Sequence, residues 1–121
     1  MQGTESECLV MDLSDFNIIW VESCEYLSEV RIPKHSHEFF HFIYVTEGMG
    51  DITIGEKRYS MSSGNIYLVP SFTNHSFFNR DKIPLKTLEI KFSMNNSVAE
   101  ETIKKLPLQT ILICLIINLL Y

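Results

Sequence analysis

Three of the four histidines in the chain lie within the stretch HSHEFFHFIYVTEG, residues 35–48. His35, His37 and His41 stand at positions i, i+2 and i+6, so a pleated strand would turn all three side chains to one face. Neutral imidazole is a good ligand for zinc, copper, nickel and iron(II), and three or four imidazoles can hold such an ion. The spacing is therefore that of a candidate metal site or of the polar wall of a ligand pocket.

A straight strand would not bring these histidines to one ion. At about 3.3 Å per residue it would hold His35 and His41 roughly 20 Å apart, so the chain must bend around residues 38–40. The remaining histidine, His75, must arrive from a neighbouring strand. On these conditions a divalent transition metal (zinc, nickel, iron or manganese) is the possible cofactor, held by His35, His37, His41 and His75.

Two alternatives to a metal site are open. The histidines could line a metal-free pocket and hydrogen-bond a small ligand, or lie partly exposed at a rim where backbone and water satisfy them. Aromatic residues surround the histidines and can supply the apolar wall that a small-molecule site needs. We therefore expect a ligand to contact these residues: His35, His37, His41, Tyr44 and His75.

Short strands must position these side chains. From residue 17 to residue 92, β-branched and aromatic runs alternate with turn residues, a pattern typical of an all-β sandwich or barrel. The expected strands cover residues 18–23, 26–32, 39–47, 50–55, 57–61, 65–70, 74–79 and 85–92. Glycines such as Gly48, Gly55 and Gly64 supply the positive φ that tight turns between them require.

The pattern changes after Phe92. Ser97 and Glu100 have the spacing of a capping box, which predicts a helix over residues 98–106, ending before Pro107. A second helix is expected through the apolar tail, where residues 108–121 would be apolar on all sides. Such a helix needs more than one partner: the outer face of the barrel, a second subunit, or residues of a longer chain. Packing within the chain and dimerisation are both open.

Composition narrows the function classes. The 121 residues are enough for one compact domain, and 45% apolar with 21% charged residues is a globular composition. A net charge of −5 argues against sequence-independent binding of nucleic-acid phosphates by this chain. Its three cysteines lack a CxxC pair, which favours reduced thiols and a cytoplasmic protein. The start lacks a signal-peptide pattern, and the apolar run of residues 111–121 is shorter than the roughly 20 residues of a membrane span.

The histidine stretch resembles the first motif of the cupin superfamily, G(x)5HxH(x)3-4E(x)6G. His35, His37 and Gly48 have the motif spacing, while His41 stands where the motif has Glu. Glu29 occupies the region of the leading Gly. The resemblance implies a cupin-like double-stranded β-helix, a jelly-roll barrel, followed here by one or two C-terminal α-helices.

A second stretch, GNIYLVPSFTNHSFFN, is similar to the second cupin motif, G(x)5PxG(x)2H(x)3N. It has Gly64, Pro70, His75 and Asn79 at the motif spacing, with Phe72 in place of the inner Gly. The two motifs together cover most of residues 26–92. Because cupins include metal enzymes as well as metal-free sensors, the fold leaves the function open.

Residues 35–78 also resemble the amino-terminal half of AraC-type transcription regulators, in which an HxH strand precedes a pattern of Gly, Pro and His. This likeness implies a barrel over residues 1–95 that binds a small-molecule effector. It also implies a helical segment over residues 96–121 that forms a homodimer, with the helix-turn-helix DNA-binding half absent. On this hypothesis the chain is not an enzyme and contacts neither nucleic acid nor membrane. The alternative is a stand-alone metal cupin enzyme of the isomerase or dioxygenase type.

Overall fold

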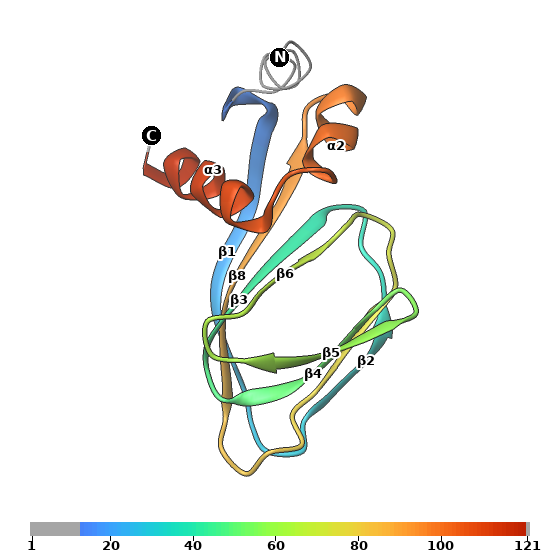
Figure 1. Cartoon of the computed structure of the whole chain (residues 1–121), viewed down its shortest axis with the longest axis vertical. Helices are drawn as coiled ribbons and strands as arrows, with labels where there is room; N and C mark the ends of the chain where they lie inside the picture. Colours follow the sequence, from blue (N-terminus) through green and yellow to red (C-terminus); the bar gives the residue numbers. More distant parts are fainter. Residues whose placement is uncertain (1–12, 121) are drawn as a thin grey trace. The chain divides into compact units, whose positions relative to one another are not determined.

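The computed structural model describes residues 13–120, which form eight strands and two α-helices (Figure 1). A short 3-10 helix, η1 (Leu13–Asp15), precedes the first strand. The strands and α-helices are β1 (Phe16–Tyr26), β2 (Arg31–His35), β3 (Phe40–Glu47), β4 (Met49–Ile54), β5 (Lys57–Ser62), β6 (Ile66–Val69), β7 (His75–Phe78), β8 (Leu85–Met94), α2 (Ser97–Ile103) and α3 (Leu108–Leu120). The prediction of an all-β jelly roll followed by C-terminal helices is therefore confirmed. None of the helices within residues 13–120 has the length and hydropathy needed to cross a bilayer.

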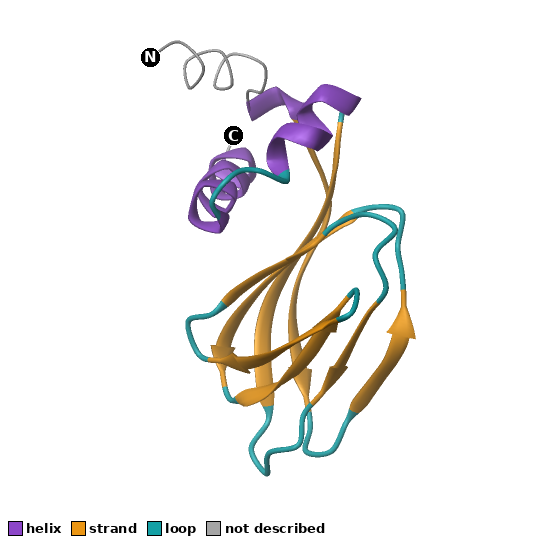
Figure 2. Ribbon diagram, turned by 45° about the vertical axis from the view of Figure 1, so that its right-hand side comes forward, coloured by secondary structure: helices purple, strands orange, loops and turns teal. Residues whose placement is uncertain are grey.

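The strands form two four-stranded sheets, ordered β1-β8-β3-β6 and β2-β7-β4-β5 (Figure 2). The chain passes from one sheet to the other between β2 and β3 and again between β3 and β4, which is how a jelly roll is wound. Alternate residues of the strands meet in the interior, because successive side chains point to opposite faces. The core cluster between the sheets contains Ile43, Val45, Ile52, Met61, Val69, Phe77 and Leu85.

The chain divides into two compact units, one of residues 20–91 and one built from the two ends of the chain. The first unit contains the core cluster and every histidine. In the second, the rings of Phe16 and Phe92 lie 5.8 Å apart between centroids, and Ile111 and Leu115 of α3 are fully buried. The end unit therefore has an apolar core of its own.

Two local predictions are wrong. Residues 27–30 form a turn and not the start of a strand, because Glu29 adopts φ 65° and Val30 N–H bonds back to the carbonyl of Leu27. The cap of α2 is Asn96, whose side chain accepts a hydrogen bond from Ala99 N–H at 2.8 Å, in place of the Ser97 capping box. Asn and Ser are about equally effective at the N-cap position, so the sequence alone did not decide between Asn96 and Ser97 as the first residue of the cap.

Gly48 is required where β3 turns into β4. Its φ is +89°, and a Cβ at this position would lie 2.4 Å from the carbonyl oxygen of Pro84. No other residue tolerates both the backbone conformation and this close approach. The Gly that closes the first motif therefore acts sterically, by allowing the chain to re-enter the second sheet.

Candidate metal and ligand site

The bend that the metal hypothesis requires is present. β2 ends at His35, residues 38 and 39 form a bend, and β3 begins at Phe40 in the other sheet. His75 is the first residue of β7, the strand that pairs with β2, and it is the register partner of His35. A tight loop also holds His37, whose carbonyl accepts a hydrogen bond from Phe72 N–H at 2.6 Å. Three histidines separated in sequence are thus fixed by backbone contacts.

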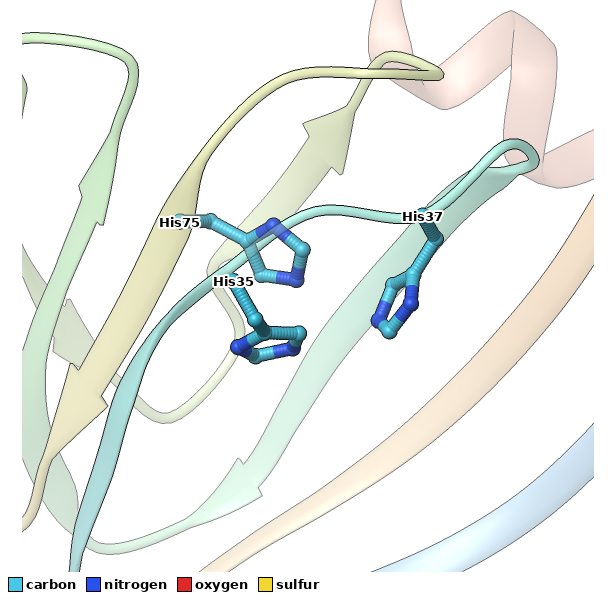
Figure 3. Close-up of side chains that lie close together, drawn as sticks. All are labelled: His35, His37 and His75. Atoms are coloured by element: carbon cyan, nitrogen blue, oxygen red, sulfur yellow. The ribbon is translucent and has the colours of Figure 1, made fainter.

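His35, His37 and His75 lie close together (Figure 3). The ring centroids of His35 and His75 are 4.2 Å apart, those of His35 and His37 are 4.7 Å apart, and those of His37 and His75 are 5.1 Å apart. Each ring offers one nitrogen within 4.8 Å of the others. Ligands held about 2.0–2.1 Å from one zinc ion are somewhat closer to each other, so the rings lie near the arrangement that a common ion needs.

Hydrogen bonds to backbone carbonyls fix the proton positions of two of these rings. The Nδ1 atom of His35 lies 2.8 Å from the Pro33 carbonyl oxygen, and Nδ1 of His75 lies 3.0 Å from that of Thr73. A carbonyl can only accept, so each Nδ1 carries the proton and the neutral ring keeps a lone pair on Nε2. Metal-bound histidines are usually oriented in this way. The residues therefore fit a metal ion by their donor chemistry.

His75 is the most buried member of the cluster. Its side chain is 1% exposed, and its Nε2 atom has no hydrogen-bond partner within residues 13–120. Burial lowers the pKa of His75 from 6.5 to about 4, and burial with the neighbouring His35 also lowers the pKa of His37. Both rings are accordingly neutral at pH 7, as metal ligands or hydrogen-bond acceptors must be.

His41 differs from the other three histidines. Its ring lies 5.8 Å from that of His75, but its Nε2 atom is 2.6 Å from Oε1 of Glu89. The other carboxylate oxygen of Glu89 accepts hydrogen bonds from Tyr26 at 2.7 Å and from Thr87 at 2.6 Å. Burial alone would raise the pKa of Glu89, but the bonds from His41 and Thr87 outweigh it and lower the pKa to about 2.

An ionised Glu89 decides which nitrogen of His41 is protonated. Because the carboxylate can only accept, Nε2 of His41 must donate, and Nδ1 is the ring nitrogen that Glu89 does not engage. That Nδ1 is buried and has no partner within residues 13–120. His41 therefore lies beside the three-histidine cluster with its Nε2 engaged by Glu89 and its Nδ1 without a partner among the described residues.

Sequence reasoning missed the acidic side of the site. Leu85, Thr87, Glu89 and Lys91 alternate along β8, and Leu85 belongs to the interior core, so Glu89 points inward. The signal was present in the alternation of LKTLEIK, where a carboxylate shares the face of a core leucine. Its pairing with His41 is a tertiary contact over 48 residues, which strand patterns do not reveal.

A second polar cluster lies on the same side. Glu22, Cys24 and Glu89 offer ligand atoms within 4.8 Å of one another, and the Cys24 thiol donates to Glu22 at 3.3 Å. Burial and the charge of Glu89 raise the pKa of Cys24 to about 12, so its sulfur remains a thiol at neutral pH. Metal ions bind the thiolate. In the metal-free chain this cluster is therefore a hydrogen-bonded lining.

Tyr44 does not join the histidines. It alternates on β3 with Phe40 and Phe42, on the face opposite His41 and Ile43, and it pairs with Ile66 of β6. The aromatic residue that does reach the cluster is Phe39, whose ring stacks on His37 with centroids 4.6 Å apart and planes 10° apart. A ligand among the histidines would meet Phe39 and Tyr26 in place of Tyr44.

Phe72 carries backbone strain next to His37. It adopts φ 60° and is 76% exposed, and it occupies the place of the inner Gly in the second motif. Left-handed backbone costs a non-Gly residue about 1 kcal/mol or more, and little burial would be lost with the ring. We expect Phe72→Gly to raise the free energy of unfolding by roughly 0.5–1 kcal/mol in urea titrations. A loss of stability would show that the exposed ring makes a contact worth more than the strain.

Comparison with known proteins agrees with this architecture. The family model described as "Cupin domain" matches residues 26–91, more than half of the chain. The chain therefore belongs to the cupin family. A search of curated protein sequences found no match.

Solved structures share the fold at low sequence identity. A protein described as a predicted oxalate decarboxylase from Thermotoga maritima is 18% identical, with a TM-score of 0.60, over 64% of this chain and 68% of that one. The Cnp3 cupin domain of Schizosaccharomyces pombe is 13% identical, with a TM-score of 0.58, over 65% and 63%. A salicylate 1,2-dioxygenase from Pseudaminobacter salicylatoxidans is 21% identical, with a TM-score of 0.59, over 62% of this chain but 22% of that one. These likenesses concern the fold alone.

Proposed function

We propose that this chain is the effector-binding and dimerisation domain of an AraC-type transcription regulator, with the effector bound inside the barrel at the histidines. The observation that carries the proposal is the pair of buried nitrogen atoms, Nε2 of His75 and Nδ1 of His41, that have no partner within residues 13–120. Buried polar atoms are nearly always satisfied. In the metal-free chain, a small molecule with polar groups would contact both atoms and would lie between His37, Phe39 and Tyr26.

A divalent transition metal is the proposed cofactor, held by His35, His37 and His75. All three can present neutral imidazole nitrogens, which suit zinc, nickel and iron(II). When bound, the ion would act as a Lewis acid that binds an oxygen atom of the effector. The Nδ1 atom of His41 would then hydrogen-bond the same molecule, since Glu89 holds its Nε2.

The apolar surface of α3 supports dimerisation. Ile111 and Leu115 are buried, whereas Ile113, Ile116 and Leu120 are 56%, 43% and 73% exposed. The exposed three stand at i, i+3 and i+7, on one stripe of the helix. We propose that a second copy of the chain covers this stripe.

Replacement of Ile116 by Glu should break the dimer. A charge within the apolar stripe would lose burial and leave a carboxylate desolvated, so we expect a monomer at micromolar concentrations at which the wild type is a dimer. Sedimentation velocity gives the mass of both. Thr110→Glu, the same charge change at an exposed position of α3 off this stripe, is the matched control and should remain dimeric. A monomeric wild type would contradict the proposed role of α3.

A metal-dependent cupin enzyme, of the isomerase or dioxygenase type, is the second candidate. The specific observation in its favour is the Glu89–His41 pair beside the three histidines, because an imidazole oriented by a carboxylate can accept a proton from a bound substrate. Proteins named as a decarboxylase and a dioxygenase are among the structures of similar fold.

Metal and ligand titration tests the proposal. The purified chain is analysed for transition metals, stripped with a chelator, and titrated with Zn²⁺ by calorimetry. We expect one ion per chain, lost in His75→Asn and retained in His41→Asn. A library of polar metabolites is then screened for shifts of the His41 and His75 side-chain NMR signals. Binding without turnover supports the sensor, turnover supports the enzyme, and absence of both metal and ligand binding overturns the assigned site.

A further inference from the structure

A hollow lies on the outer face of the β2-β7-β4-β5 sheet, away from the histidines. Its volume is about 320 Å³, and no histidine lines it. Small-molecule sites range from about 300 to 1,000 Å³, so the hollow is large enough for a small metabolite. Strand alternation explains its position, because Ile52 and Phe77 point into the core while Asp51 and Phe78, their neighbours, point outward.

Arg31 is held in place over an aromatic ring at the edge of this hollow. It is the register partner of Phe78, and its guanidinium carbon lies 4.0 Å from the centroid of the Phe78 ring. Stacking occupies the face of a guanidinium and leaves its N–H donors free at the edge. Within residues 13–120, neither Arg31 nor the neighbouring Lys34 forms an ion pair with a carboxylate. Two cations with unused donors therefore line one side.

Asp51 anchors further positive charge at the opposite side. Its side chain is 7% exposed, and its oxygens bind Arg58 at 3.1 Å and Arg80 at 3.3 Å. Both arginines are more than half exposed, so most of each guanidinium faces solvent. The negative charge of Asp51 is thus already neutralised by ion pairs. The charged residues that line the hollow are three cations, Arg31, Lys34 and Arg58, and one carboxylate, that of Asp51. The hollow is positive although the chain carries a net charge of −5.

Neutral donors complete the lining. Thr53 and Ser76 are register partners on β4 and β7, and Thr53 also pairs with Arg58 of β5. Their hydroxyls lie in a cross-strand row between the cations, where they can donate to an oxygen that the guanidinium groups bind. Carboxylate and phosphate are the groups that a planar guanidinium fork matches.

We infer that this hollow is a second ligand site, separate from the histidines, for a small anion that bears a carboxylate or phosphate group. Arg31 and Lys34 bind the anionic group, and Arg58, fixed by Asp51, sets the opposite wall. The ring of Phe78 supplies the apolar floor. This inference does not depend on the function proposed for the barrel interior.

NMR titration of the chelator-treated chain tests the second site. Succinate and inorganic phosphate are the two probes, used at low ionic strength because salt screens exposed charges. We expect saturable shifts of residues around Arg31 and Ser76, and the better probe tells carboxylate from phosphate recognition. Arg31→Gln and Lys34→Gln should each weaken binding roughly three- to fivefold.

Lys57→Gln is the matched control for charge. Lys57 is an exposed cation on β5 that does not line the hollow, so its loss should change the affinity less than about twofold. If Lys57→Gln and Arg31→Gln weakened anion binding equally, the anion would be attracted by positive charge in general and not by this hollow. That result would overturn the site. So would linear, non-saturating shifts with both probes.

Discussion

Replacement of Glu89 by Ala should lower the free energy of unfolding by about 3–5 kcal/mol. Glu89 is 2% exposed and accepts hydrogen bonds from His41, Tyr26 and Thr87, so its removal leaves two buried donors and the half-buried Tyr26 hydroxyl without an acceptor. Each buried donor left unsatisfied costs about 1–3 kcal/mol before any relaxation. The total free energy of unfolding of a domain is only about 5–15 kcal/mol. The variant should therefore unfold at much lower urea concentration.

Substitutions of single hydrogen-bond donors measure how much each bond to Glu89 contributes to this loss of stability. Tyr26→Phe and Thr87→Val each remove one donor and keep the carboxylate, so each should cost about 1 kcal/mol. Glu25→Ala, the loss of an exposed carboxylate on β1, is the control and should stay within about 0.5 kcal/mol of the wild type. A Glu89→Ala variant as stable as Glu25→Ala would contradict the buried network and, with it, the protonation assigned to His41.

The strand pattern was sufficient to predict the barrel because its information is local. Alternation of apolar residues with turn glycines gives seven strands close to their observed ranges, whereas the strand expected over residues 26–32 overlaps β2 only at residues 31 and 32. The expected bend between His35 and His41 follows from strand rise alone. The two departures from the motif glycines are instructive. Glu29 and Phe72 both adopt positive φ, so the backbone keeps a conformation that favours glycine although the side chains differ. A comparison of sequence motifs therefore counts Glu29 and Phe72 as mismatches, although both residues keep the backbone conformation that the motif glycines would have.

The site was predictable only in part because its partners are distant in sequence. The spacing of His35 and His37, with His75 in the second motif, anticipates the cluster that the structure brings together. The different role of His41 could not be anticipated, since it depends on Glu89 arriving from β8. Tyr44 was assigned by its proximity in sequence, although strand alternation places it on the other face of β3.

Stability should fall as the pH is lowered from about 6.5 to about 4, by about 3 kcal/mol in the metal-free chain. Burial lowers the pKa of His75 from 6.5 to about 4 in the folded state. Between these values the unfolded chain binds a proton that the folded chain does not, so unfolding is favoured as the pH falls. Below about pH 4 both states are protonated and this contribution stops changing. The lowered pKa of His37 acts in the same direction.

His75→Asn separates this effect from ordinary acid unfolding. The Asn amide can still donate to the Thr73 carbonyl but does not titrate, so the variant should lose most of the slope between pH 6.5 and 4.5. Glu89 adds a slope of its own only below about pH 4.5, because its folded pKa is about 2. Urea unfolding of both proteins at half-unit pH steps, with chelator present, measures the difference. An unchanged slope in His75→Asn would mean that another group carries the pH dependence and that His75 is not held neutral by burial.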